Sequence, residues 1–271
     1  MIHRVACIQM TSTENVSENL SEAKKMLQKA SDEGAKLVVL PENFSIMDLD
    51  PMDKVKYKEA FGHGPIQDFL KNEAAHHGIW IVGGTIPLAA PMNQEKVYAA
   101  CLVYNDRGDC VGRYDKIHLF DVKLRESQEN HNESKTIAPG NEVIVIDTPF
   151  GKLGLAVCYD LRFPELFRLM QTSGAEIIAL PAAFTQVTGL AHWDILIRAR
   201  AIENQVYMLA AAQTGEHPDH RKTYGHSMIV NPWGEVKASL PLGIGALSAD
   251  IDLNFLHQLR GDFPVLQHRK H

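Results

Sequence analysis

The chain has 271 residues, 45% of them hydrophobic and 22% charged, with a formal net charge of −6. This is the composition of an ordinary globular protein that can bury a sizeable core. The acidic balance argues against a nucleic-acid-binding protein, which would carry a basic surface. No apolar stretch approaches the roughly 20 residues of a membrane-spanning helix, and we expect no signal peptide because the chain opens directly into a strand-like segment.

The cysteines and histidines carry no metal-binding or disulfide pattern. The four cysteines are scattered, without a C-x-x-C pair, which is typical of a protein in a reducing, cytoplasmic setting. Cys7 and Cys101 lie within apolar runs, where a cysteine usually serves packing. The thirteen histidines do not combine with other ligands at zinc-like spacing. We therefore expect neither a metal nor another cofactor.

The first half of the chain predicts a strand (residues 5–10), an amphipathic helix (16–31), buried strands (37–40 and 79–82) and a hairpin (97–104 and 110–114). The second half repeats this order with strands at 153–157, 177–180 and 207–212, a helix at 164–173 and a hairpin at 227–230 and 235–240. The segment 34–44, GAKLVVLPENF, is echoed by 174–184, GAEIIALPAAF. We predict one domain over residues 1–271, a four-layer α-β-β-α sandwich with an internal pseudo-two-fold repeat.

Cys158 is the most informative candidate for chemistry. It follows a buried strand and precedes a turn and the helix that begins at Pro164. At such a strand end, near a helix amino terminus, we expect an exposed sulfur whose thiolate is favoured. The alternative is a cysteine that serves packing.

Two more residues follow strands and complete a plausible reaction centre. Glu42 stands where the echoed segment has Ala182, and Lys116 follows the first hairpin. Taken alone, each is more typical of a solvated surface residue. Together with Cys158 they supply a base, a cation and a nucleophile, and the backbone N–H of Tyr159 adds a second donor for an oxyanion.

With these three residues in their order along the chain, the sequence resembles the nitrilase superfamily of carbon–nitrogen hydrolases, and within it the Nit branch. The resemblance covers essentially the whole chain. It is carried by the motifs LPENF (40–44), YDKIHL (114–119), LAVCYDLRFPEL (155–166), AHW (191–193), RARAIE (198–203), YGHSM (224–228) and NPWG (231–234). It implies the same sandwich fold and a Glu42–Lys116–Cys158 triad.

The resemblance also implies a second active-site glutamate between the lysine and the cysteine. Its place in the loop identifies Glu133, which would orient Lys116, although Glu126 and Glu129 are close enough in sequence to compete for this role. Arg162 is a candidate for binding a substrate carboxylate, with a structural ion pair to Glu165 or Asp160 as the alternative.

The family implies amide hydrolysis through a thioester, with Glu42 as base, Cys158 as nucleophile and Lys116 at the oxyanion. Within the Nit branch, the segments around Phe184 and Thr185, which we expect to contact substrate, resemble the amidases of deaminated glutathione. Alternatives are ω-amidases of α-ketoglutaramate and hydrolases of N-carbamoyl amines or aliphatic amides.

Nitrilases usually carry Trp after the cysteine, so Tyr159 disfavours a nitrile substrate. Two readings from other classes are an inactive scaffold and a redox sensor built on Cys158. The resemblance further implies a homodimer or a higher homo-oligomer.

Overall fold

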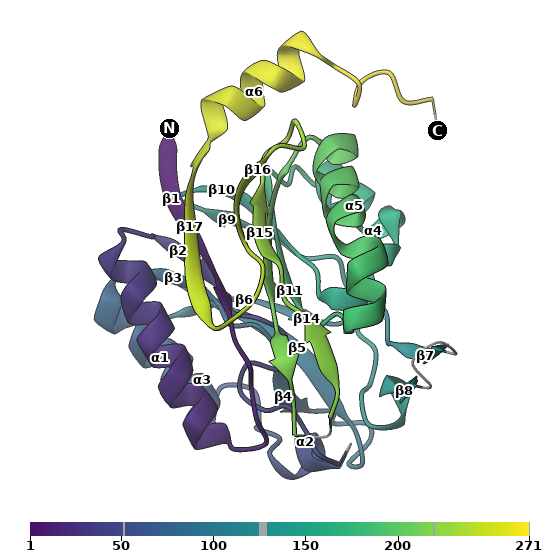
Figure 1. Ribbon diagram of the computed structural model, residues 1–271. Coiled ribbons are helices and arrows are strands. Elements are labelled where there is room, and N and C mark those ends of the chain that lie inside the picture. The colour runs from purple at the N-terminus through teal and green to yellow at the C-terminus, as the bar shows by residue number, and fades with distance from the viewer. Residues whose placement is uncertain (51, 125–128, 219, 271) are drawn as a thin grey trace.

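Two β-sheets face each other, with helices on their outer sides (Figure 1). The structure is a computed structural model that describes residues 1–50, 52–124, 129–218 and 220–270. Helices α1 (Val16–Asp32) and α3 (Pro65–His77) cover one sheet, whereas α4 (Pro164–Thr172) and α5 (Gln186–Asn204) cover the other. The predicted α-β-β-α sandwich is confirmed.

The first sheet has the strand order β17-β1-β2-β3-β5-β4, with β6 paired to β5. Its strands are β1 (Ile2–Gln9), β2 (Leu37–Val39), β3 (Trp80–Val82), β4 (Ile86–Ala89), β5 (Val97–Tyr104), β6 (Cys110–Asp115) and β17 (Gly245–Asp252). The second sheet has the order β16-β15-β12-β11-β10-β9. Its strands are β9 (Val145–Thr148), β10 (Gly151–Leu155), β11 (Ile177–Ala182), β12 (Tyr207–Ala212), β15 (Ser227–Val230) and β16 (Val236–Leu240).

The two sheets repeat one topology. In the first, β1 pairs in parallel with β2 and β2 with β3, after which β3, β5 and β6 pair antiparallel. In the second, β10, β11 and β12 pair in parallel in the same way, and β12, β15 and β16 pair antiparallel. The echo between segments 34–44 and 174–184 therefore marks equivalent strands, β2 and β11, in the two halves.

Alternation along the strands sends side chains to two apolar layers. On β1, Val5 and Cys7 belong to the cluster shared by both sheets, whereas Ala6 and Ile8 pack with Leu27 of α1. This follows from the two-residue period of a strand. The shared cluster also contains residues of the second sheet, of α4 and of α5. Because both halves contribute to it, we propose that residues 1–271 form one domain.

Local sequence signals explain where the helices begin. The side chain of Asn15 accepts from the backbone N–H groups of Ser17 and Glu18 at the start of α1, and Thr185 accepts from Thr188 N at the start of α5. Pro65 and Pro164 occupy the first turns of α3 and α4, where a missing N–H is harmless.

The sequence did not predict several smaller elements. These include strands β4 and β9, helices α2 (Asp53–Lys56) and α6 (Leu253–Asp262), and two short antiparallel pairs, β7 (Asp121–Leu124) with β8 (Glu129–Asn132) and β13 (Thr214–Glu216) with β14 (Lys222–Tyr224). Strand β17 also escaped prediction, although it pairs along the whole of β1. In the part of the chain that is described, no helix combines the length and apolar character needed to cross a membrane.

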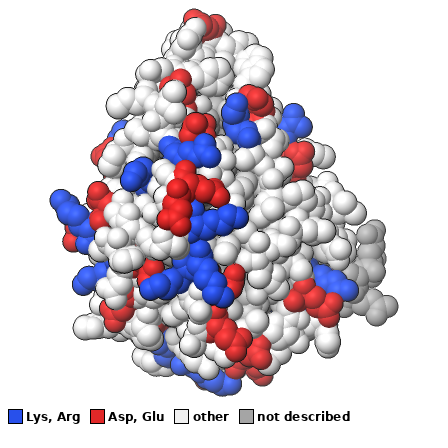
Figure 2. Space-filling view, turned by 60° about the vertical axis from the view of Figure 1, so that its left-hand side comes forward, with Lys and Arg blue, Asp and Glu red and all other residues white. Residues whose placement is uncertain are grey.

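Basic and acidic side chains lie next to one another on the α1 side of the molecule (Figure 2). Lys25 pairs with Glu22 on α1, and Arg4 pairs with Asp250 across β1 and β17. Carboxylates beside the basic groups would repel a phosphate backbone. The mixed charge of this face is consistent with the net charge of −6 and with the expectation that the protein does not bind nucleic acid.

Candidate active site

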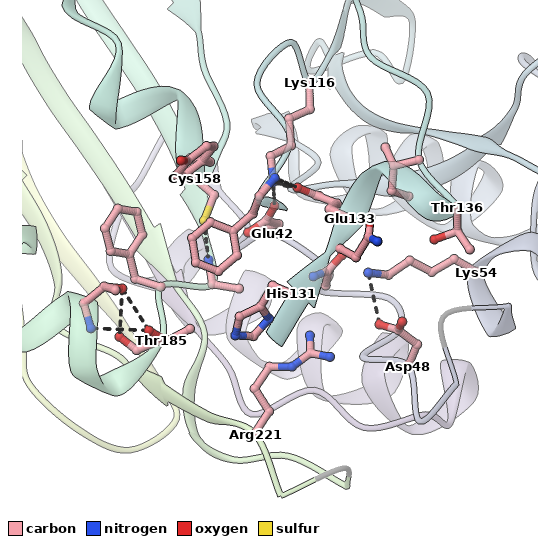
Figure 3. A pocket seen from close by; sticks show the side chains of 18 of the residues that line it. Glu42, Asp48, Lys54, Lys116, His131, Glu133, Thr136, Cys158, Thr185 and Arg221 are labelled. Carbon is pink, nitrogen blue, oxygen red and sulfur yellow. Dashed lines mark hydrogen bonds and ion pairs between the residues drawn. The ribbon is translucent and has the colours of Figure 1, made fainter. Parts of the chain in front are cut away.

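The three predicted triad residues come together at strand ends. Lys116 directly follows β6, whereas Glu42 follows β2 and Cys158 follows β10 after two further residues each. Lys116 Nζ lies 2.8 Å from Glu42 Oε1, and the Cys158 thiol lies close enough to both for their charges to act on it. Figure 3 shows the sulfur and the two charged groups pointing into the same space. All three side chains are buried, with Lys116 only 2% exposed.

The backbone at the nucleophile is in the left-handed region. Cys158 has φ = +47°, a conformation that is strained for a side chain with a Cβ and is concentrated at functional sites. It opens a short 3₁₀ helix, Cys158–Arg162, and α4 begins only at Pro164. The predicted sharp turn is therefore present, and a 3₁₀ segment of 5 residues separates the backbone of the nucleophile from α4.

Asp160 ties this turn to the segment that carries Lys116. Its carboxylate is fully buried and accepts from Val157 N at 2.8 Å and from Tyr114 Oη at 2.7 Å. It also accepts from His118 N at 3.1 Å and lies 2.6 Å from His118 Nδ1. Tyr114 and His118 flank Lys116 in sequence. One carboxylate thus fixes the relative position of the cation and the thiol.

A close backbone approach supports Glu42 in a similar way. A Cβ on Gly84 would lie 2.1 Å from Pro41 O, so only glycine allows the chain after β3 to pass the Glu42 loop. The neighbouring Thr85 Oγ1 accepts from Asn43 N at 2.8 Å. The segment that follows β3 therefore holds the loop that carries Glu42.

Glu133 is the glutamate that contacts Lys116. Its Oε1 and Oε2 lie 2.8 and 2.9 Å from Lys116 Nζ, and Oε2 also accepts from Phe120 N. Glu129, one of the two competing residues, pairs instead with His131. Glu126, the other, lies outside the described residues. The geometry therefore places Glu133, and not Glu129, beside the lysine.

The charges around Lys116 determine its ionisation. Burial alone would lower the pKa of its ammonium group, but the carboxylates of Glu133 and Glu42 raise it well above the ordinary value. Lys116 is therefore a permanent cation over the whole physiological pH range. A buried cation between two carboxylates can stabilise negative charge that develops nearby.

The expectation of an exposed, thiolate-favouring Cys158 is wrong. The residue is 8% exposed, and burial raises the pKa of its thiol well above the ordinary value. The charge of Glu42 and a hydrogen bond to it raise the pKa further, while Lys116 and the N–H of Ala183, 3.5 Å from Sγ, lower it. Desolvation outweighs the cation, so the resting group is a thiol that needs a base.

The other three cysteines differ from Cys158 in their surroundings. Cys7 and Cys101 are fully buried in the core, where burial raises the pKa of both thiols, and Cys110 lies on an exposed part of β6. All four cysteines are free. Only Cys158 has a lysine and a carboxylate beside its sulfur among the described residues.

A cavity of about 170 Å³ opens in front of the triad. Its walls come from both halves of the chain and carry both polar side chains and aromatic rings. The lining residues include Asn43, Phe120, His131, Thr136, Tyr159, Arg162, Phe184, Thr185 and Thr188. Over the described residues, no three His, Cys, Asp or Glu side chains gather in a group that could hold a metal ion.

Arg162 belongs to the cavity wall. Its guanidinium lies over the rings of Tyr159 and Phe184, at 5.8 and 5.3 Å from their centroids, and 3.2 Å from His192 Nδ1. In the described part of the chain no ion pair joins it to Glu165 or Asp160. Asp160 instead accepts hydrogen bonds from Val157 N, Tyr114 Oη and His118 N. The structure thus disfavours the alternative of a local ion pair.

The two other residues expected to contact substrate also line the cavity. Phe184 packs against Trp193 of α5 and presents its ring beneath Arg162. Thr185 is buried, and its hydroxyl lies 2.9 Å from Thr188 Oγ1 at the start of α5. Its side chain therefore has a capping function beside any contact with a ligand.

A second group of charges lies at another part of the same cavity. Lys54 of α2 forms an ion pair with Asp48, 3.0 Å apart, and Arg221 also lines this part (Figure 3). Burial alone would raise the pKa of the Asp48 carboxyl, but the charges of Lys54 and Arg221 lower it. These residues come from three separate segments.

A model of the family described as Carbon-nitrogen hydrolase matches residues 4–261. The chain belongs to this family. It is therefore an enzyme that hydrolyses non-peptide C–N bonds of amides, in agreement with the resemblance of its motifs.

Relatives with curated names are similar to this carbon–nitrogen hydrolase over nearly its whole length. A deaminated glutathione amidase of Yersinia enterocolitica is 41% identical and covers 98% of the chain and 92% of its own length. The human protein of the same name is 42% identical, with 98% of the chain and 82% of its own length covered.

Solved structures of similar proteins have the same fold. The Caenorhabditis elegans NitFhit protein has a TM-score of 0.91 and 37% identity, covering 99% of the chain, which in turn spans 65% of that longer protein. Nit3 of Saccharomyces cerevisiae, described as a member of branch 10 of the nitrilase superfamily, has a TM-score of 0.87 and 33% identity, covering 97% of the chain and 94% of its own length.

Sequence reasoning missed three parts of the site. Asp160 was considered only as a partner for Arg162, although it follows the nucleophile by two residues. The Ala183 N–H reaches the sulfur from the end of β11, which no local pattern shows. Lys54 and Asp48 stand in a polar stretch whose charges look like ordinary surface residues until the fold brings them into the cavity.

Proposed function

We propose that this carbon–nitrogen hydrolase is a cysteine-dependent amidase that cleaves deaminated glutathione through a thioester. The observation that carries the proposal is the buried cluster of Cys158, Lys116 and two carboxylates at the wall of a cavity. The names of the curated relatives support the choice of substrate. Deaminated glutathione is glutathione with a keto group in place of its amino group, and its non-peptide amide joins the keto-acid part to cysteinylglycine.

The first step follows from the protonated resting thiol. Glu42 takes the proton as Sγ attacks the amide carbonyl and an S–C bond forms. The negative charge that develops on the carbonyl oxygen is stabilised by Lys116 and by the backbone N–H of Tyr159. Because Lys116 is already charged and fixed at 2.8 Å from two carboxylates, it needs no reorganisation during the reaction.

The second step breaks the C–N bond and leaves the acyl group on sulfur. Glu42 returns its proton to the departing amine, which is cysteinylglycine here and would be ammonia for α-ketoglutaramate. Water then enters, Glu42 takes one of its protons, and the hydroxide attacks the thioester. The thiolate leaves and regains the proton, so the enzyme returns to its starting state and the products are an acid and an amine.

Glu133 acts on this chemistry through Lys116. Its two oxygens lie within 2.9 Å of Nζ, and its contact to the Phe120 N–H fixes the carboxylate. It holds the ammonium group in one orientation while Glu42 changes its protonation state. We therefore regard Glu133 as a positioning residue.

Arg162 is proposed to bind the carboxylate of the keto-acid part. Its guanidinium is presented into the cavity by stacking on Phe184 and Tyr159, close to the nucleophile in sequence and in space. A guanidinium and a carboxylate form charge-assisted hydrogen bonds that select for acidic substrates. The same contact would bind α-ketoglutaramate, which has the same acyl group.

The proposal is tested by steady-state rates on a panel of amides. Deaminated glutathione, α-ketoglutaramate, an aliphatic amide, an N-carbamoyl amine and a nitrile are offered to the wild-type protein and to Cys158→Ser. We expect the highest kcat/KM on deaminated glutathione and no turnover by the variant. A higher kcat/KM on a substrate that lacks carboxylates would refute the substrate assignment.

Two further expectations stay predictions. These are the cytoplasmic setting, based on the scattered cysteines, and the homo-oligomer, based on the family. Cell fractionation and light scattering of the purified protein test them.

A further inference from the structure

The charged group at the far part of the cavity has no role in the thioester chemistry. Lys54 is 14% exposed and Asp48 is 8% exposed, and their charges meet at 3.0 Å. Arg221, which donates to Met47 Sδ at 3.6 Å, lines the same wall. Surface ion pairs in this protein are different: Lys56, two residues from Lys54, is 66% exposed in its pair with Asp53. An ion pair that is mostly buried and faces a cavity is a candidate for binding a ligand.

Two cations, Lys54 and Arg221, line one wall of the cavity, and the Asp48 carboxylate holds Lys54 in place. Asp48 follows the Glu42 loop, Lys54 lies on α2, and Arg221 precedes β14. Both cations influence the Asp48 carboxyl. The Lys54 ammonium group has three donors, one of which is directed at Asp48, and the Arg221 guanidinium carries a planar fork of five. Such a pair can bind a carboxylate that enters from the cavity.

We propose that Lys54 and Arg221 form a subsite for a carboxylate on the leaving group, with Asp48 as the residue that positions Lys54. The inference rests on the proposed function and deepens it. The ligand class is an amine that ends in a carboxylate, as the cysteinylglycine part of deaminated glutathione does. The subsite makes the enzyme selective for the amine side of its substrate as well as for the acyl side.

The direction of the leaving group follows from the placement of the carboxylates. The departing amine must lie next to Glu42 to receive its proton. In Figure 3, Glu42 lies on the side of Cys158 that leads past Glu133 to Thr136, Lys54 and Asp48, while Thr185 lies on the opposite side of Cys158. Arg162 belongs to that opposite side through its contact with Phe184. The acyl part therefore points toward Arg162 and the amine part toward Lys54.

The length of the leaving group agrees with this orientation. Two residues of extended chain span at most about 7 Å, so a dipeptide carries its terminal carboxylate well beyond the triad. Ammonia, the leaving group of α-ketoglutaramate, has nothing to place there. The subsite thus separates a peptide-like substrate from a primary amide with the same acyl group.

The test compares two nearly isosteric substrates, deaminated glutathione and its C-terminal amide, in which glycinamide replaces glycine. Wild type, Lys54→Met, Lys54→Arg and the matched control Lys56→Met are assayed for kcat/KM on both. We expect Lys54→Met to lose about 10- to 100-fold on the carboxylate substrate, the range of a hydrogen bond between charged groups, mainly through KM. On the amide substrate it should lose less than about 3-fold, within the range of a neutral contact.

The remaining variants are controls for the charge at position 54, for a nearby surface lysine and for folding. Lys54→Arg should recover most of the lost activity, and Lys56→Met should behave as wild type on both substrates. The double variant Asp48→Asn/Lys54→Met removes the carboxylate that the single variant leaves unpaired, so it keeps the test valid if the single variant folds poorly. It should show the same selective loss.

Two results would overturn the subsite. One is equal kcat/KM of the wild type on the two substrates, and the other is equal loss on both in the Lys54 variants. Both leave the proposed function intact, because deaminated glutathione is still cleaved. Absence of wild-type activity on either substrate, with activity on another amide of the panel, would instead refute the proposed function and the subsite together.

Discussion

Replacing Lys116 by methionine should remove activity and also destabilise the protein. The side chain is 2% exposed, and its Nζ is the shared partner of Glu42 and Glu133, each at 2.8 Å. In Lys116→Met two carboxylates face each other across an apolar side chain of similar length. Breaking a buried ion pair by removing one partner costs about 3–5 kcal/mol. With an unfolding entropy of about 2.1 cal/mol/K per residue, this lowers the Tm by roughly 5–9 °C.

The loss of thermal stability in Lys116→Met should depend on pH. In the wild type the charges of Glu133 and Glu42 raise the pKa of Lys116, so this stabilisation is complete below the ordinary lysine pKa of about 10.4 and is lost only as pH rises beyond it. In the variant, the like charges raise the pKa of one carboxyl. A carboxyl with a raised folded pKa destabilises as pH rises above its unfolded value of about 4.3. The Tm deficit should therefore be larger at pH 7 than at pH 5.

Differential scanning calorimetry at the two pH values measures both effects. The double variant Lys116→Met/Glu133→Gln should recover part of the Tm because it removes one of the two facing carboxylate charges, and Lys56→Met should melt as wild type does. A Lys116→Met protein that melts at the wild-type temperature at pH 7 would refute the charge balance described for this site.

Two further substitutions test the surroundings of the triad. Arg162→Met should lower kcat/KM at least about 10-fold on a dicarboxylate amide and much less on a neutral amide; equal losses would remove its assignment to carboxylate recognition. Asp160→Asn keeps the shape but weakens the contacts to Val157 N and Tyr114 Oη, so kcat and the rate of Cys158 alkylation by iodoacetamide should both fall with KM little changed; an unchanged alkylation rate would contradict its positioning role.

The fold was predictable because its signals are local and repeated. The apolar run at β2 and its echo at β11 identify buried strands, and Pro164 marks a helix start. Strand β17 was not predictable in the same way, because its pairing with β1 joins the two ends of the chain. Only the folded sheet shows that contact.

The site was predictable where each residue follows a strand. Glu42, Lys116 and Cys158 share that feature. Because β2 and β6 run in the same direction, Glu42 and Lys116 reach one edge of the first sheet, and the packing of the second sheet brings Cys158 beside them. The protonation state of Cys158 was predicted wrongly, because burial depends on the surrounding layers and not on its own segment. Lys54 and Arg221 were missed for a related reason: a short helix and a loop carry them to the cavity from regions without any motif.

The central claim is that Cys158 carries the acyl group. The wild-type protein is mixed with deaminated glutathione, quenched in acid during steady state, digested and analysed by mass spectrometry. We predict the keto-acid acyl group as a thioester on the peptide that contains Cys158, and its absence in Cys158→Ser together with loss of turnover. Turnover by Cys158→Ser at the wild-type rate, or an acyl group on any other residue, would contradict the account.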